Sequence, residues 1–170
     1  MGLRILYNPS PILRQVSSPI THNIDLYDLI SDLMFAIRYK DEVWTGIGLS
    51  ICAVQIGLPV RVMIMGRERF WKLGKPHCAF DIFLDPKIVW KSSDTWDQWE
   101  GCLSIPEKEC LVSRHISLII RYQNMLGKTL EKQFTGTASR VIQHELDHFD
   151  GILMIDKAKD HRKKLPHIIK

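Results

Sequence analysis

Two stretches of the chain place apolar side chains at the three- and four-residue spacing of a helix buried on one side. The first spans residues 25–40, and its apolar positions are Leu26, Leu29, Ile30, Leu33, Met34 and Ile37. The second starts at Thr137, a residue type that caps helices, and runs to about Asp150, where Gly151 follows as a stop signal. The pattern therefore predicts a long helix near each end of the chain.

Between these helices the pattern changes to short runs of β-branched and aromatic residues, which predict strands. The runs are Val60–Met65, Ile82–Leu84, Ile88–Trp90, Ile116–Tyr122 and Thr129–Phe134. The last two flank residues 123–127, a predicted hairpin loop. Strands gathered between helices, rather than alternating with them, indicate an α+β fold. A length of 170 residues fits a single domain over residues 1–170. A short helix is also predicted over residues 10–15, where Ser and then Pro begin it.

The composition narrows the class of protein without naming a function. Hydrophobic residues make up 45% and charged residues 25%, which excludes disordered and fibrous chains. No apolar run approaches the roughly 18 residues of a membrane helix, so no membrane association is expected. The N-terminus lacks a charged-then-apolar signal, and the four cysteines have no CxxC spacing. We therefore expect a cytoplasmic protein with reduced thiols.

The net charge of +4 is too small to imply nucleic-acid binding over a whole face. The excess is local, because residues 157–164 carry five basic side chains and one acidic one. A solvated C-terminal helix is the simplest prediction for this tail, and a tether to an anionic surface such as ribosomal RNA is the alternative. Residues 66–80 are basic and aromatic and are predicted to form a surface loop.

The late helix carries the strongest chemical signal, the segment His144-Glu145-Leu146-Asp147-His148. Four residues turn a helix by about 400°, so both imidazoles project from one face and can bind a single metal ion. Glu145 follows the first histidine and lies within reach of a water molecule held there. The segment therefore predicts a hydrolytic metal site.

Catalytic metal sites of this kind use three protein ligands, and the two histidines do not identify the third. Met154 stands where a third histidine would complete the HExxHxxGxxH pattern, and no Glu occurs after Glu145. Asp150, Asp156 and His161 are the downstream candidates. Upstream, Cys102 in Glu100-Gly101-Cys102-Leu103-Ser104 offers a thiolate, although a lone cysteine is as often a small buried hydrophobe.

A third segment, Gly48-Leu49-Ser50-Ile51-Cys52-Ala53-Val54-Gln55, consists of small and apolar residues that end in an amide. Small side chains let a ligand approach the backbone, and Gln55 can donate a hydrogen bond. A tightly packed turn leading into the strand at Val60 is the competing interpretation.

Together the three segments resemble the peptide deformylase family, whose motifs are GΦGΦAAxQ, EGCΦS and QHExDH. The second and third motifs match fully at Glu100–Ser104 and Gln143–His148. The first departs at two positions, because Ser50 stands for the second Gly and Cys52 for the first Ala. The resemblance extends over residues 3–157.

The resemblance implies small antiparallel sheets wrapped around a central helix that carries the HExDH motif. It implies a metal held by Cys102, His144 and His148, with Glu145 as the acid/base. Fe²⁺ is the implied native metal, and Zn²⁺, Ni²⁺ or Co²⁺ can replace it. The implied reaction is hydrolysis of the N-formyl group from the formylmethionine of nascent polypeptides, with release of formate. The implied form is a monomer.

The resemblance also assigns groups around the reacting carbonyl. The Gln55 amide and the backbone N–H of Leu103 are the implied oxyanion donors. Gly48, Leu49 and Ser50 resemble the strand that binds the peptide substrate, and Ser50→Gly is expected to be tolerated. Glu100 resembles a structural acid paired with Arg114. Gln143 and Asp147 are candidates for orienting the metal ligands.

Two other functions are compatible with these residues. A metalloprotease of the HExxH type is disfavoured because its downstream third ligand is missing. A binding protein on a deformylase scaffold that no longer catalyses is conceivable because of Ser50 and Cys52, although the metal ligands, Glu145 and Gln55 are all present.

Overall fold

The computed structural model describes residues 4–21, 23–39, 50–67 and 80–163. A five-stranded sheet has the order β1-β2-β3-β6-β7, and a three-stranded sheet has the order β4-β5-β8. Every pairing of neighbouring strands is antiparallel. The strands are β1 Ser50–Cys52, β2 Val62–Gly66, β3 Phe80–Lys91, β4 Thr95–Cys102, β5 Ile105–His115, β6 Ser117–Gln123, β7 Thr129–Thr135 and β8 Asp160–Lys163.

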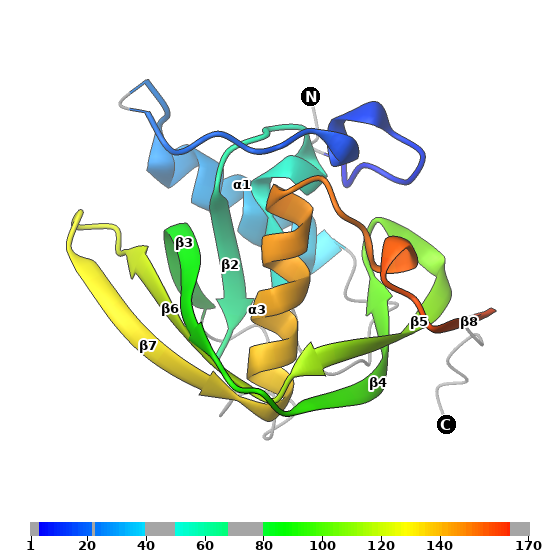
Figure 1. The fold of residues 1–170 in the computed structure, drawn as a ribbon. Helices are drawn as coiled ribbons and strands as arrows, with labels where there is room; N and C mark the ends of the chain where they lie inside the picture. Colours follow the sequence, from blue (N-terminus) through cyan, green and yellow to red (C-terminus); the bar gives the residue numbers. More distant parts are fainter. Residues whose placement is uncertain (1–3, 22, 40–49, 68–79, 164–170) are drawn as a thin grey trace.

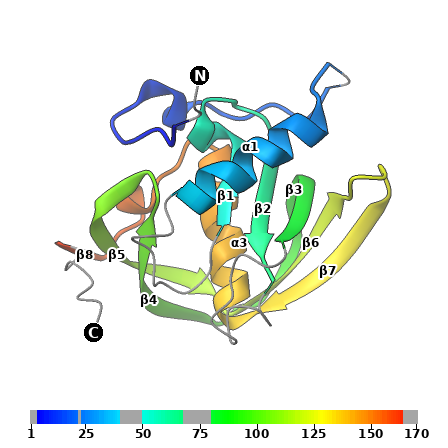
Figure 2. The ribbon, with the colours of Figure 1, turned by 180° about the vertical axis from the view of Figure 1, so that it is seen from behind.

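The helix α3, Gly136–Phe149, lies between the two sheets, and α1, Leu26–Tyr39, covers the opposite face of the five-stranded sheet (Figure 1 and, from behind, Figure 2). The described residues also form short 3₁₀ helices: η1 Pro11–Arg14, η3 Ala53–Ile56 and η5 Met154–Asp156. The α+β class is confirmed, as is the central helix wrapped by antiparallel sheets.

Strand β2, within the five-stranded sheet, is buried on both faces. Val62 and Ile64 pack in the cluster that contains the apolar side of α1. Met63 and Met65 point the other way and pack with the apolar side of α3. A strand covered on both faces reads as a continuous apolar run, and this is the run Val60–Met65 seen in the sequence.

The helix predictions are confirmed with small shifts. The helix predicted over 25–40 is α1, and the short one predicted over 10–15 is η1. The late helix begins at Gly136, so Thr137 lies inside the first turn and the prediction that it is the cap is wrong. Gly151 ends α3 with φ +70°, and a Cβ there would lie 2.6 Å from the carbonyl oxygen of Arg14. Only glycine fits a left-handed turn packed this closely against η1.

The strand predictions were less complete. The runs Ile82–Leu84 and Ile88–Trp90 belong to one strand, β3, which bulges between them. The hairpin of β6 and β7 is confirmed. Strands β4 and β5 were not predicted, because β4 is rich in polar and bulky residues and does not alternate cleanly.

The prediction of a C-terminal helix is wrong. Residues Asp160–Lys163 form β8, which pairs with β5 along an open edge. Of the predicted loop 66–80, residues 68–79 lie outside the described residues, as do Gly48 and Leu49. Among the described residues, no helix is both long and apolar enough to cross a membrane.

Candidate active site

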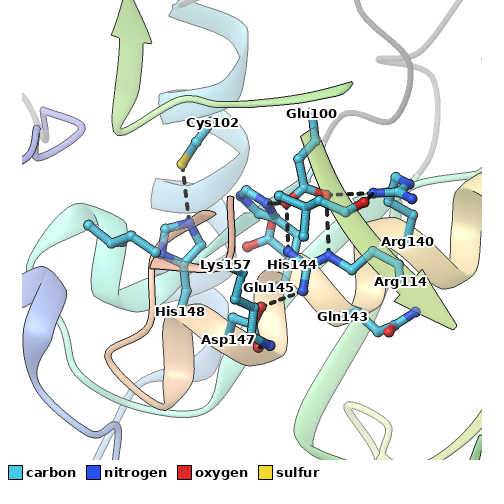
Figure 3. Close-up of polar contacts among 12 residues, drawn as sticks. Glu100, Cys102, Arg114, Arg140, Gln143, His144, Glu145, Asp147, His148 and Lys157 are labelled. Atoms are coloured by element: carbon cyan, nitrogen blue, oxygen red, sulfur yellow. Dashed lines mark hydrogen bonds and ion pairs between the residues drawn. The ribbon is translucent and has the colours of Figure 1, made fainter. Parts of the chain in front are cut away.

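Helix α3 carries both histidines of the HExDH segment toward the end of β4, where Cys102 lies (Figure 3). The Cys102 Sγ and the His148 Nε2 are 3.2 Å apart, and the two imidazole rings lie 5.0 Å apart between centroids. One ligand atom from each of these three residues lies within 4.8 Å of the other two. All three side chains are buried, so the donors converge in a protected site.

The chemistry of the donor set suits a divalent metal ion. A thiolate and two imidazoles are the ligands of zinc-like and iron-like catalytic sites. His144 Nδ1 lies 3.1 Å from the carboxylate of Glu100, a contact that assigns the Nδ1 proton and leaves Nε2 free as a ligand. Burial holds the pKa of His148 well below its usual value, so this imidazole is in the neutral, metal-binding form.

The other candidates for a third ligand do not reach this site. Asp150 pairs with Arg61 at 2.9 Å, and Asp156 pairs with Arg14. His161 lies on exposed β8. Among the described residues, Cys102 is therefore the one candidate whose ligand atom lies close to those of both histidines.

Glu145 is 2% exposed, and its two carboxylate oxygens differ in their hydrogen bonding. The hydroxyl of Ser50 donates to Oε1 at 2.6 Å, whereas Oε2 has no hydrogen-bond partner among the described residues. Burial raises the pKa of Glu145, and the hydrogen bonds from Ser50 and Cys52 offset part of that rise. A buried carboxyl with a raised pKa is suited to acid/base chemistry near neutral pH.

Gln55 lies beside Cys102, where the resemblance to the first motif leads us to expect it. Its Nε2 donates to Ser104 Oγ at 3.1 Å and lies 3.8 Å from Cys102 Sγ. Its Oε1 accepts from the backbone N–H of Cys52 at 3.0 Å, so the amide is oriented with its donor side toward Cys102 Sγ. The interpretation of this segment as a packing turn alone is therefore incomplete.

The comparison with known families agrees with this geometry. The family model described as polypeptide deformylase matches residues 3–164. The chain belongs to the peptide deformylase family. A peptide deformylase of Phenylobacterium zucineum is 37% identical over 157 residues, covering 92% of this chain and 88% of that protein. One of Erythrobacter litoralis is 31% identical over 188 residues, covering 97% and 94%.

Solved structures of the family share the fold. The crystal structure of peptide deformylase from Thermotoga maritima has a TM-score of 0.80 and 28% identity, covering 94% of this chain and 99% of that one. A class I type b peptide deformylase from Acinetobacter baumannii, bound to Met-Ala-Ser, has a TM-score of 0.77 and 26% identity, covering 92% and 98%. The chain is therefore a hydrolase of a metal-dependent family that acts on N-terminal formyl groups, and this function is favoured over a protease or a non-catalytic binding protein.

Buried charged side chains anchor helix α3, and the motifs revealed only some of them. Arg114 donates to Glu100 at 2.6 Å and also pairs with Asp147, which in turn binds Lys157 at 2.6 Å. The predicted pair of Glu100 and Arg114 is confirmed. Burial would raise the pKa of Glu100, but His144 and Arg114 outweigh it and hold this pKa well below the usual value. Glu100 therefore stays ionised as a partner for His144.

Sequence reasoning missed Arg140, which donates to Glu100 at 3.1 Å and to the Val112 carbonyl at 2.9 Å. The available signal was its position four residues before His144, which puts both on one face of α3. Gln143 was expected to orient a ligand. Instead its amide exchanges hydrogen bonds with the backbone of His115, at 3.0 and 2.9 Å, and fastens α3 to the end of β5.

Proposed function

We propose that Cys102, His144 and His148 hold one divalent metal ion and that Glu145 is the acid/base that removes the formyl group from N-formylmethionyl peptides. The observation that carries the proposal is the convergence of the three ligand atoms within 4.8 Å, with Glu145 next to His144 on the same helix. Fe²⁺ is the proposed native metal, with Zn²⁺, Ni²⁺ or Co²⁺ as substitutes.

A divalent ion held by Cys102, His144 and His148 would act as a Lewis acid and make hydroxide available near neutral pH. Glu145 takes up the proton that water loses and delivers it to the amine that leaves when the formyl C–N bond breaks. A raised pKa favours uptake of the water proton by Glu145, which can then carry that proton to the leaving amine. The products are formate and a free amino terminus.

Gln55 and Leu103 are proposed to stabilise the oxyanion that develops on the formyl oxygen. The Gln55 amide donates beside Cys102, and Leu103 follows Cys102 directly in the chain. Preorganised donors of this kind lower the barrier because they require no reorientation during the reaction.

The substrate is proposed to bind along β1. This strand is at the edge of the five-stranded sheet, and its second edge has no partner strand within the described ranges. A peptide in extended form can add to such an edge through backbone hydrogen bonds. Gly48, Leu49 and Ser50 are the proposed contacts, and a relative solved with bound Met-Ala-Ser supports a methionyl peptide as the occupant.

Binding to the ribosome through the basic tail, a monomeric state and a cytoplasmic location remain predictions. In the described part of the tail, Lys157, Lys159 and Arg162 pair with Asp147, Asp97 and Glu109. Their charge is therefore partly neutralised, and any attraction to ribosomal RNA is weaker than the sequence alone suggested.

The direct test is formate release from formyl-Met-Ala-Ser by protein purified without oxygen and loaded with Fe²⁺. We expect turnover with the formyl peptide and none with an internal peptide bond. Cleavage of an internal bond without formate release would favour the HExxH protease, and a metal-free protein with no turnover would favour a binding protein.

A further inference from the structure

Strand β1 places a hydroxyl directly on the proposed acid/base. Successive side chains of a strand point to opposite faces, so Ser50 and Cys52 face α3 while Ile51 packs in the cluster of α1. The Ser50 Oγ lies 2.6 Å from Glu145 Oε1, a short bond from a neutral donor to a carboxylate. The strand is held in place by its pairing with β2, in which Ser50 lies opposite Met65.

The carboxylate of Glu145 needs such a contact to have a defined orientation. Rotation about the last torsion of a Glu side chain has broad, shallow minima, so packing of the carbon stem does not fix the carboxylate plane. Among the described residues, Oε2 has no hydrogen-bond partner. The thiol of Cys52, also on β1, interacts with the same carboxylate. A thiol is a weak donor, so the bond from the Ser50 hydroxyl is the stronger of the two contacts, and it anchors Oε1.

We propose that Ser50 is a positioning residue that fixes the carboxylate plane of Glu145 for proton transfer. This inference rests on the proposed acid/base role of Glu145. The first motif of the family has glycine at this position, and glycine has no side chain to make the contact. The serine that replaces the motif glycine then contributes to catalysis in this chain. We therefore no longer expect Ser50→Gly to leave turnover unchanged.

The test compares Ser50→Thr with Ser50→Val, which have the same shape and differ only in the hydroxyl. Both are β-branched and suit a strand. We expect Ser50→Val to lower kcat about tenfold, the loss typical of removing one hydrogen bond to a charged group, with KM little changed. Ser50→Thr should recover most of that loss. Metal content, the visible spectrum of Co²⁺-loaded protein and the melting temperature should match between the two variants.

Equal kcat values for the two variants would overturn the positioning role, and a difference confined to KM would assign Ser50 to substrate binding instead. If both variants are inactive because of bulk, Ser50→Ala decides: a kcat lowered about tenfold supports the proposal, and wild-type kcat overturns it. Glu145→Gln is measured alongside. Wild-type turnover there would overturn the acid/base role itself, whereas an inactive Glu145→Gln beside a fully active Ser50→Ala overturns the positioning role alone.

Discussion

The proposed role of Cys102 as a metal ligand depends on the residues that surround it. In the sequence it was one of four cysteines, and in the structure its sulfur lies 3.2 Å from His148 Nε2. We predict that Cys102→Ala lowers the metal content of the purified protein well below one ion per chain. Cys110→Ala is the matched control, because Cys110 is also a buried thiol of the three-stranded sheet but is not among the three converging ligands. Full metal occupancy in Cys102→Ala would contradict ligation by this thiol.

Gln55 is the second residue whose role depends on a neighbour, because its amide is oriented by Cys52 and Ser104. Removing an oxyanion donor usually costs roughly 10²–10³-fold in turnover. Gln55→Ala should therefore lower kcat by that order, with metal content unchanged. Gln55→Glu should be worse, since it puts a negative charge beside the developing one. A stable Gln55→Ala enzyme with wild-type kcat would remove Gln55 from the mechanism.

At the scale of elements, the two helices and the hairpin were predictable because each is a local pattern. The apolar spacing of α1 and the i, i+4 histidines of α3 need no knowledge of the rest of the chain. Strand β4 was missed because its polar and bulky residues do not alternate cleanly, and most of its side chains are exposed or half-buried. The tail was misread because charged residues occur both on solvated helices and on exposed edge strands such as β8.

The contact between η1 and η5 offers a test of element packing away from the site. Arg14 Nη2 lies 3.2 Å from Asp156 Oδ1, and the hydrogen bond from Arg14 lowers the pKa of Asp156. A lowered pKa stabilises the fold above the unfolded value of about 3.9, and the contribution is lost as the pH falls through the folded value. Both side chains are about 40% exposed, so the effect is below about 1 kcal/mol.

Accordingly, Asp156→Asn should lower the free energy of unfolding at pH 7, and the difference from wild type should shrink as the pH is lowered toward 3. Urea unfolding at several pH values measures this. Glu107→Gln is the control, because Glu107 is exposed and forms no ion pair among the described residues, so we expect no pH-dependent difference. A loss in Asp156→Asn that is equal at pH 7 and pH 3 would show that the ion pair is not its cause.

At the scale of the whole molecule, the order of helices and strands indicated the α+β class, and three motifs in order predicted the site residues. The motifs could not show that Arg114, Arg140 and Glu100 form a buried charge cluster behind His144, because these residues come from three different elements. Nor could they show that Ser50 reaches Glu145 across 95 positions of sequence. Such contacts depend on the packing of β1, β4 and β5 around α3.

The half-life of the enzyme's activity in air should depend on which metal ion it holds. A site with a thiolate and Fe²⁺ holds two oxidisable groups. We predict that the Fe²⁺ enzyme loses activity in air and is preserved without oxygen, whereas the Ni²⁺ enzyme is stable in both. Half-lives measured in parallel check this, and equal values for both metals under both atmospheres would count against Fe²⁺ as the native ion.

The central claim is that Glu145 transfers protons at a metal held by Cys102, His144 and His148. Its most direct test is the rate of formate release from formyl-Met-Ala-Ser by Glu145→Gln, measured together with its metal content. The amide keeps the shape of the side chain but cannot carry a proton. The account predicts full metal occupancy with turnover lowered by about 10²–10⁴-fold. Near-normal turnover in a fully loaded variant would contradict it.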